Sequence, residues 1–534
     1  VGHFIIPAKN NYYHRNSKRT MPDKTTTRLP LHININTDVF TTKTNFRRKL
    51  LQESPLISQA LNFFKTSIIF KQPLLLFLIF LFCICLYGII RFPTKEEIII
   101  SQEVPAVDVL SNVFPTDGDG ETTAILLNWS RLENLKIIVK HLCQYSMFKE
   151  IMIWNNNGDI YLSDKVRGNM YFIARYMACA MATTPYCYFQ DDDWIIRHMR
   201  SMYANFLRFP NLIHTDTNAD VYSLTNWKWC FFDDAVDLHA CFSWVGTGAF
   251  ASRDNVVRFL KMASITEMDP TEFAYGDMYF TTFMNQVPYQ LENELMELPQ
   301  ENAFSAGNGR IRNKIYMHKA LVRLYDHLSR KTGAFETKEI SPSIYQRDVR
   351  SPCENDRCLF LTNKNSFPDV RAFRYRPYIN ISESERIHES YYDTGHFIRH
   401  PYSHAVDDKD WTAWKSQEVI RKDDYISLDL LFPMPFPLIF TLIVDHHRDY
   451  FSSLNMKIQI SYNGIDWIQL SPLPKIEVRQ LPRTGLDGRT HLLLCTFQIR
   501  ETGIRFVKLT STREWEFPYG IYDFSFHARI DKFC

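Results

Sequence analysis

Short apolar runs alternate with segments of helical periodicity between residues 122 and 190. The runs TTAILLNW (122–129), KEIMIWNNN (149–157) and PYCYFQ (185–190) have the length and composition of buried strands. Residues 131–145 and 169–184, which lie between them, carry apolar side chains at three- and four-residue spacings and are predicted to be helices. Strands that alternate with helices predict an α/β domain with a mostly parallel, doubly wound sheet.

The pattern changes after about residue 330. Residues 331–394 combine prolines and charged residues without a sustained period, and we interpret them as an irregular linker. From residue 395 to 534, short apolar runs such as LIFTLIVDHH and HLLLCTFQI are separated by turn residues. Short strands at this spacing predict an all-β sandwich.

One segment has the length and apolarity of a membrane span. Residues 72–90, QPLLLFLIFLFCICLYGII, carry no charged side chain and would cover roughly 28 Å as a helix. Lys and Arg are more frequent on its N-terminal side, which places the N-terminus in the cytosol and the rest of the chain in the lumen. A signal-anchor transmembrane helix is therefore predicted, with a buried core helix as the alternative.

The predicted layout follows from these patterns. The expected order is a cytosolic tail (1–65), the signal-anchor helix (66–92), a lumenal stem (93–121), the α/β domain (122–330), the linker (331–394) and the sandwich (395–534). The formal net charge of +2 in 534 residues gives no reason to expect a nucleic-acid partner. In an oxidising lumen, Cys353 and Cys358 of SPCENDRC are predicted to form a local disulfide.

The strongest chemical signal is Gln190-Asp191-Asp192-Asp193-Trp194, directly after an apolar strand. Mg²⁺ and Mn²⁺ prefer carboxylate oxygens, and such an ion can neutralise a diphosphate leaving group. Alternate side chains of an extended segment point the same way, so Asp191 and Asp193 are expected to share one ligand while Asp192 points elsewhere. A solvated acidic loop is the alternative interpretation of the triplet.

Polar residues also follow the other two predicted strands. Asn128 ends the first, and Asn155, Asn156 and Asn157 end the second. Because the carboxyl ends of the strands form the ligand crevice of an open α/β sheet, these asparagines are expected to meet the acidic triplet there.

Residues 122 to about 325 resemble the GT-A fold of glycosyltransferases, in the manner of family-2-like and exostosin-like enzymes. The resemblance rests on AILLNWSRLENL, IMIWNNN, TTPYCYFQDDDW, WVGTGAF and EFAYGDMYF, in that order. It implies a Rossmann-like domain that transfers a hexose from a nucleotide-diphosphate donor, with a UDP-sugar favoured. It further implies Mn²⁺ or Mg²⁺ as the cofactor, bound through a DxD-type motif, and a hydroxyl of a glycan, glycoprotein or glycolipid as the acceptor.

The resemblance also implies roles for individual residues. Those assigned to the donor nucleotide and its sugar are Asn128, Trp129, Arg131, Asn155, Asn156, Asn157, Arg175, Asp191, Gly246 and Gly248. Those assigned to the metal ion are Asp191, Asp193 and His318. The alternatives are ordinary turn residues at the strand ends and glycines, a surface position for the arginine, and simple packing for the histidine.

Asp277, in Tyr275-Gly276-Asp277, lies where the family carries an acidic residue at a helix start. In an inverting enzyme this carboxylate would take the proton from the acceptor hydroxyl. In a retaining enzyme it would orient or stabilise the sugar, and helix capping is the non-catalytic alternative. The family often has Glu-Asp at this point, whereas this chain has Gly-Asp.

DDKDWTAW, ISYNGIDW and FVKLTSTREW resemble the coagulation-factor-type discoidin domain, a jelly-roll β-sandwich. This resemblance implies a module that holds a glycan acceptor, with a purely structural role as the alternative. The whole chain is expected to be a single-pass type II glycosyltransferase of the Golgi or endoplasmic reticulum membrane with a lumenal catalytic domain. The alternatives are a membrane-tethered glycan-binding protein with an inactive transferase-like domain and a metal-dependent phosphosugar transferase.

Overall fold

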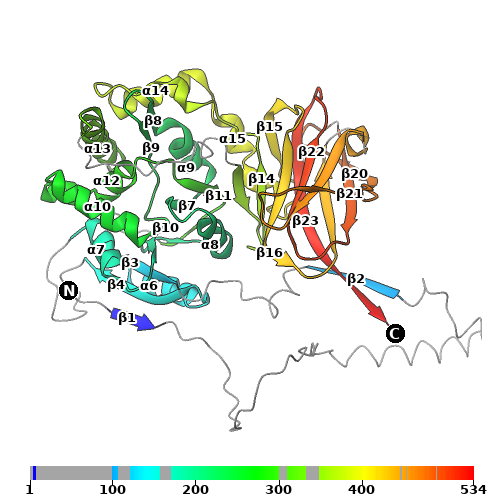
Figure 1. The fold of residues 1–534 in the computed structure, drawn as a ribbon, viewed down its shortest axis with the longest axis horizontal. Helices are drawn as coiled ribbons and strands as arrows, with labels where there is room; N and C mark the ends of the chain where they lie inside the picture. The colour runs from blue at the N-terminus through cyan, green and yellow to red at the C-terminus, as the bar shows by residue number, and fades with distance from the viewer. Residues whose placement is uncertain are drawn as a thin grey trace, which may run out of the picture. The chain divides into compact units, whose positions relative to one another are not determined.

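The computed structural model describes residues 4–7, 99–105, 121–156, 170–299, 309–331, 348–445, 448–452, 454–488 and 490–533. The described residues between Glu103 and Ile530 belong to one compact unit of mixed α/β structure, which confirms the mixed class (Figure 1). The expected membrane span at residues 72–90 lies outside the described residues. Within the described ranges, no helix combines the length and apolarity that a bilayer crossing needs.

A seven-stranded sheet forms the first half of this unit, in the order β1-β4-β3-β5-β10-β7-β11. The strands are β1 (Phe4–Pro7), β3 (Thr122–Asn128), β4 (Phe148–Asn155), β5 (Tyr186–Gln190), β7 (His214–Thr217), β10 (Ala249–Ser252) and β11 (Tyr289–Glu292). The main helices are α6 (Leu132–Leu142), α7 (Ile173–Met181), α8 (Met199–Arg208), α10 (Arg253–Ile265), α12 (Gly276–Phe283) and α13 (Gly309–Ser329). The strands and helices predicted between residues 122 and 190 are therefore confirmed.

The sheet is mostly parallel, as expected, because β4, β3, β5, β7 and β11 run in one direction and two of its seven described strands run against them. Strands β4, β3 and β5 are parallel, as are β7 and β11, but β1 and β10 run antiparallel to their neighbours. The segment before β10 crosses the carboxyl end of β5, where the Asp191 backbone N–H donates to the Gly246 carbonyl at 2.7 Å. Because β10 enters the sheet from that end, it has to run back along β5.

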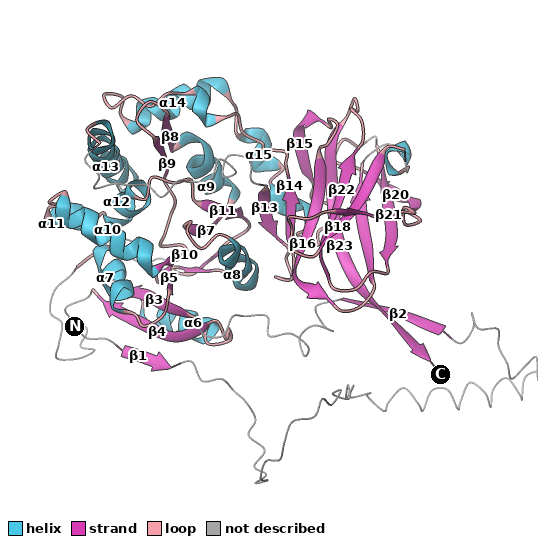
Figure 2. Cartoon of the chain, viewed as in Figure 1, coloured by secondary structure: helices cyan, strands magenta, loops and turns pink. Residues whose placement is uncertain are grey.

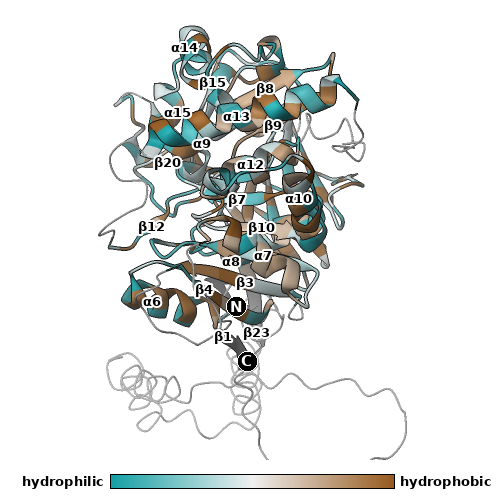
Figure 3. Ribbon diagram, turned by 90° about the vertical axis from the view of Figure 1, so that its left-hand side faces the viewer, coloured by the Kyte–Doolittle hydropathy of each residue, from teal (hydrophilic) through white to brown (hydrophobic). Residues whose placement is uncertain are grey.

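Alternate side chains of β3 supply two separate cores, one on each face of the sheet. Ile125 and Leu127 join the core that contains α7, α10 and α12, whereas Ala124 and Leu126 join the one that contains α6 and α8. In Figure 3, β3 and β4 are largely hydrophobic, whereas α6 carries both kinds of residue. A strand buried on both faces loses the polar alternation of a half-exposed strand, which explains the continuous apolar runs in the sequence.

The second half consists of two antiparallel sheets that share one hydrophobic core (Figure 2). One sheet has the order β13 (Val349–Pro352), β14 (Leu359–Thr362), β16 (Tyr425–Met434), β22 (Ile504–Ser511), β18 (Met456–Ser461) and β19 (Ile468–Gln469). The other runs β15 (Trp414–Val419), β23 (Pro518–Phe533), β17 (Leu438–Val444), β21 (His491–Ile499) and β20 (Glu477–Thr484). The strands predicted between residues 395 and 534 are confirmed, although this range also contains α15 (Gly395–Arg399) and the 3₁₀ helices η6 (Tyr402–Ala405) and η7 (Arg448–Phe451).

The expected linker contains regular structure. Strands β13 and β14 pair with each other, β14 pairs with β16, and α14 (Ile381–Tyr391) follows. The run Leu359-Phe360-Leu361 is buried in the cores, so these four-residue strands are set by tertiary contacts rather than by a visible period. The predicted disulfide between Cys353 and Cys358 is confirmed and closes the hairpin between the two strands.

The remaining elements are short. The strands are β2 (Ile99–Pro105), β6 (Trp194–Ile195), β8 (Cys230–Asp233), β9 (Leu238–Cys241) and β12 (Met296–Glu297), and the helices are α9 (Ala219–Ser223), η3 (Leu224–Lys228), α11 (Pro270–Phe273), η5 (Val370–Ala372), α15 (Gly395–Arg399), η6 (Tyr402–Ala405) and η7 (Arg448–Phe451). Strand β12 pairs with β6 and brings the chain after β11 back to the residues that follow the acidic triplet.

Candidate active site

The chain reverses its direction of winding at β3. It passes from β3 through α6 to β4 on one side, and then through α7 to β5 on the other side of β3. Such a switch point leaves a crevice at the carboxyl ends of the central strands, where ligands bind in open α/β sheets. Asn128 is paired with Asn155 across β3 and β4, and the Asn128 Nδ2 donates to the Asn155 Oδ1 at 2.9 Å. Asp191 follows β5 at the same edge, so the three strand ends meet as expected.

The acidic triplet forms a turn rather than an extended segment. Arg175 donates to the Asp191 carboxylate at 2.6 Å, and Arg131 donates to that of Asp192 at the same distance. The Asp193 carboxylate lies 3.5 Å from the same Arg131 nitrogen. Asp192 therefore does not point away from the cluster as expected, because the chain turns at residues 192–193 and brings the Asp192 and Asp193 carboxylates to one guanidinium.

Residues that the sequence patterns did not single out hold this turn in place. Asn134 of α6 donates to the Asp192 and Pro299 carbonyls, both at 2.9 Å. The Leu298 backbone N–H donates to the Asp193 carbonyl at 2.8 Å. The sequence carries a signal for Asn134, because an asparagine occupies the buried face of a helix that otherwise buries apolar residues.

Asp277 lies in the first turn of α12 and is 4% exposed. Its Oδ1 accepts a hydrogen bond from the Tyr176 hydroxyl at 2.6 Å and lies 3.4 Å from the Arg175 Nε. The capping alternative has no support, because no described side chain caps the start of α12. A Cβ on Gly276 would lie 3.2 Å from the Ile173 backbone nitrogen, which explains why a glycine precedes Asp277 in this chain.

The two glycines of the WVGTG segment contact the same region. A Cβ added to Gly246 would lie 2.1 Å from the Asp191 Oδ2, and one added to Gly248 would lie 2.5 Å from Ile196. Gly248 also has a φ of +141°, which other residues rarely adopt. These positions need glycine because the Asp191 carboxylate and the Ile196 side chain occupy the space that a Cβ would take.

The charges of the cluster fit a divalent cation. Burial, followed by the charge of Asp191, raises the pKa of Asp193 to about 7, and burial raises the pKa of Asp277 to about 6. Burial also raises the pKa of Asp192. With every group ionised, four carboxylates face two guanidiniums, so the cluster carries 4 − 2 = 2 excess negative charges. A divalent cation would offset this excess, and carboxylate oxygens are its preferred ligands.

The side chains that the structure describes do not complete such a site by themselves. Among the residues that the structure describes, no three side chains of His, Cys, Asp or Glu converge as a metal site requires. His318 of α13 is therefore not grouped with Asp191 and Asp193, and burial lowers its pKa. Magnesium sites that use one or two carboxylates commonly complete their coordination with water and substrate phosphates.

The remaining residues assigned to the donor differ in their surroundings. Trp129 is 48% exposed, and its backbone N–H donates to the Asp192 carboxylate at 3.4 Å. Asn156 donates to the Tyr171 carbonyl and accepts from the Met170 N–H, so it supports local backbone. Asn157 lies outside the described residues.

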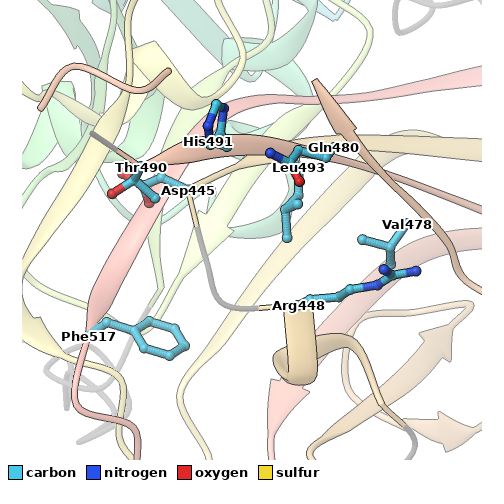
Figure 4. Close-up of a pocket in the computed structure, with 8 residues that line it drawn as sticks. All are labelled: Asp445, Arg448, Val478, Gln480, Thr490, His491, Leu493 and Phe517. Carbon is cyan, nitrogen blue, oxygen red and sulfur yellow. The ribbon is translucent and has the colours of Figure 1, made fainter. Parts of the chain in front are cut away.

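A separate cavity of about 460 Å³ lies on the β-sheet half (Figure 4). Its polar lining includes Asp445, Arg448, Gln480 and His491, of which the last three are exposed. Asp445 is already paired with the Lys415 Nζ at 2.9 Å. The cavity has no residue in common with the acidic cluster.

Comparisons with known proteins find little. No protein-family model and no curated protein matches the chain. Among solved structures, one similarity is to a single-residue mutant of chitosan-binding module 1 from a chitosanase/glucanase of Paenibacillus sp. IK-5. It has 16% identity, covers 24% of this chain and 83% of that one, and has a TM-score of 0.16. A likeness at this level carries no argument about fold or function.

Proposed function

We propose that this chain is a metal-dependent glycosyltransferase whose first half has a GT-A fold. The observation that carries the proposal is the position of the acidic turn. Asp191 and Asp193 follow the central strand β5 at the switch point of the sheet, in a cluster that carries two excess negative charges when all four carboxylates are ionised. A nucleotide-diphosphate sugar, a UDP-sugar by preference, combines the phosphates and the polar nucleoside that such a crevice could bind.

The residues around the crevice divide into three groups. Asn128, Asn155 and the exposed ring of Trp129 would contact the nucleoside. Asp191 and Asp193 would hold Mn²⁺ or Mg²⁺, which when bound neutralises charge on the diphosphate. Gly246 and Gly248 would act on the donor site indirectly, because they leave room for the Asp191 carboxylate and the Ile196 side chain beside it.

Asp277 is the proposed general base. In an inverting reaction its carboxylate takes the proton of the acceptor hydroxyl while the acceptor oxygen bonds to the anomeric carbon. The bond from that carbon to the diphosphate oxygen breaks, and the nucleoside diphosphate leaves. A base that retains its proton up to about pH 6 suits proton transfer near neutral pH.

The proposal extends to the other parts of the chain. The two-sheet half would be a jelly-roll, discoidin-like module that holds a glycan, glycoprotein or glycolipid acceptor. Residues 66–92 would anchor the chain as a type II protein in the Golgi or endoplasmic reticulum membrane, with the catalytic half in the lumen.

The test is binding and turnover of a panel of nucleotide sugars by the full-length chain, with and without Mn²⁺. Asp191→Asn/Asp193→Asn is expected to lose metal-dependent binding of the donor, whereas Asp326→Asn on the exposed side of α13 is not. Failure of the folded wild-type chain to bind any donor would overturn the proposal in favour of a tethered glycan-binding protein. Transfer of a phosphosugar rather than a sugar would identify the reaction as phosphosugar transfer.

A further inference from the structure

We propose that Arg175 and Tyr176 are positioning residues that hold the Asp191 and Asp277 carboxylates in one arrangement, and that Arg175 does not bind the donor diphosphate. This inference rests on the proposed function, and it reassigns the role that the family resemblance implies for Arg175. Both residues belong to α7, which lies between the end of β5 and the start of α12.

Arg175 joins the two halves of the acidic cluster from the protein interior. Its side chain is fully buried and lies against the face of Phe172, with 5.2 Å between the guanidinium carbon and the ring centroid. The Arg175 Nη2 lies 2.6 Å from the Asp191 Oδ1, and the Arg175 Nε lies 3.4 Å from the Asp277 Oδ1. The guanidinium has no exposed surface, and its two shortest charged contacts are to the Asp191 and Asp277 carboxylates, which supports a role in holding them.

Tyr176 fixes Asp277 from a second direction. Its hydroxyl donates to the same Oδ1 that faces the Arg175 Nε. The Tyr176 ring is fully buried, and its centroid lies 4.5–5.4 Å from those of Phe189, Phe259 and Phe280. Because three aromatic rings pack around the buried Tyr176 ring, they restrain its position, and the hydroxyl in turn restrains the Asp277 carboxylate.

The helix that carries both residues is itself tethered. The disulfide between Cys179 and Cys187 joins α7 to β5, with 5.9 Å between the Cα atoms. Cys179 lies one helical turn after Arg175, and Cys187 lies four residues before Asp191. The covalent link and the close contact of Gly276 with Ile173 therefore set the separation of Asp191 from Asp277.

The chain provides a matched pair of variants for the test. Tyr176→Phe removes the hydrogen bond to Asp277 and keeps the ring. Tyr279→Phe removes an equivalent buried bond, in which the Tyr279 hydroxyl donates to Glu272 at 2.7 Å, without contact to the cluster. We expect Tyr176→Phe to lower kcat by about tenfold to 100-fold with little change in the donor KM, because misplacing a reacting group by about 1 Å has effects of that size. Tyr279→Phe should lower Tm to a similar extent and leave kcat unchanged.

A structural measurement makes the result independent of turnover. In crystal structures of the full chain, Tyr176→Phe should show the Asp277 carboxylate displaced from the Arg175 Nε, and Tyr279→Phe should not.

Arg175→Lys keeps the charge and should raise the Mn²⁺ concentration that half-saturates metal binding, with donor affinity at saturating Mn²⁺ unchanged. An Asp277 carboxylate that stays in place in Tyr176→Phe, or an Arg175→Lys variant that loses donor affinity at saturating Mn²⁺, would overturn the inference. Absence of transfer by the wild type would count against the proposed function alone, since the crystal structures would still decide the positioning role.

Discussion

Gly246 and Gly248, beside the acidic turn, have as little free space as the side chains that they contact. The Gly246 carbonyl accepts the Asp191 N–H, and the missing side chain at Gly246 leaves room for the Asp191 carboxylate. Substitution at Gly246 therefore acts on the geometry of Asp191 without changing any charge.

Gly246→Ala is expected to abolish metal-dependent donor binding while the chain still folds. The new Cβ would lie 2.1 Å from the Asp191 Oδ2, so the carboxylate has to move at a cost of about 1–3 kcal/mol. Gly395→Ala is the control, because its Cβ would lie 3.0 Å from the carboxylate of Asp393, which is exposed and can move away. Thermal unfolding and Mn²⁺-dependent donor binding would be measured for both variants. Unchanged donor binding by Gly246→Ala would contradict the close packing of the Asp191 carboxylate against Gly246.

The stability of the metal-free chain should depend on the ionisation of Asp193. Its pKa is raised from 3.8 to about 7, so ionisation costs more in the folded than in the unfolded state. The protonated Asp193 carboxyl therefore stabilises the folded chain. This stabilisation is fully present below about pH 4 and is lost as the pH rises through about 7. When the pH is raised from about 5 to about 8, the Tm of Asp193→Asn should therefore fall less than that of the wild type.

Metal addition provides the second half of this experiment. Mn²⁺ at about pH 8 should raise the Tm of the wild type and leave that of Asp193→Asn nearly unchanged, because a bound ion stabilises only the folded chain that binds it. Asp326→Asn, on the exposed face of α13, should follow the wild type in both measurements. Equal pH profiles for the wild type and Asp193→Asn would rule out a buried, ionisation-sensitive carboxylate.

At the scale of elements, α7 connects the carboxyl end of β5 to the proposed base. The Cys179–Cys187 bond spans eight residues, and a loop of that size is worth about 2–3 kcal/mol to the folded state. The Cys353–Cys358 bond spans five residues and lies in the hairpin of β13 and β14, so it offers a comparison of similar size elsewhere in the chain.

Removal of either disulfide should lower Tm, but only one removal should affect the site. Cys179→Ala/Cys187→Ala is expected to reduce kcat as well as stability, because α7 is no longer tied to β5. Cys353→Ala/Cys358→Ala should reduce stability by about 2 kcal/mol and leave kcat unchanged. Calorimetry measures the loss of stability, and steady-state kinetics measures the loss of kcat. Equal kcat values for the two double variants would show that the Cys179–Cys187 disulfide does not affect catalysis.

At the scale of the whole molecule, the α/β half and the two-sheet half share buried polar contacts. Asp429 of β16 is fully buried and accepts from Arg505 at 2.7 and 3.1 Å. Arg208 of α8 lies 3.5 Å from the same carboxylate, and Arg350 of β13 lies 3.9 Å from it. Glu292 of β11 also accepts two hydrogen bonds from Ser403 of η6. The contacts between these elements indicate one folding unit rather than two independent modules.

Asp429→Ala should destabilise the described unit by about 3–5 kcal/mol, because it leaves one buried and two partly buried guanidiniums without their shared carboxylate. Unfolding followed by calorimetry is expected to show one transition for the described unit in the wild type. Asp326→Ala breaks an exposed pair with Arg330 at 2.9 Å and should cost less than about 1 kcal/mol. Two separate transitions in the wild type, or equal effects of the two variants, would contradict the single unit.

The sequence by itself determined the features that depend on neighbours along the chain. The strands ending at Asn128, Asn155 and Gln190, the helices between them and the Cys353–Cys358 bond follow from local period, composition and short spacing. Their meeting at one edge follows from the parallel direction of β4, β3 and β5.

Only the tertiary structure decided the contacts between distant residues. Arg175 faces Asp191 across 16 positions, and Tyr176 faces Asp277 across 101. The direction of β10, the position of β13 and β14 in a sheet and the need for glycine at residue 246 arise in the same way. No local pattern encodes such contacts, because each depends on the order in which the strands assemble and on the space that their side chains leave.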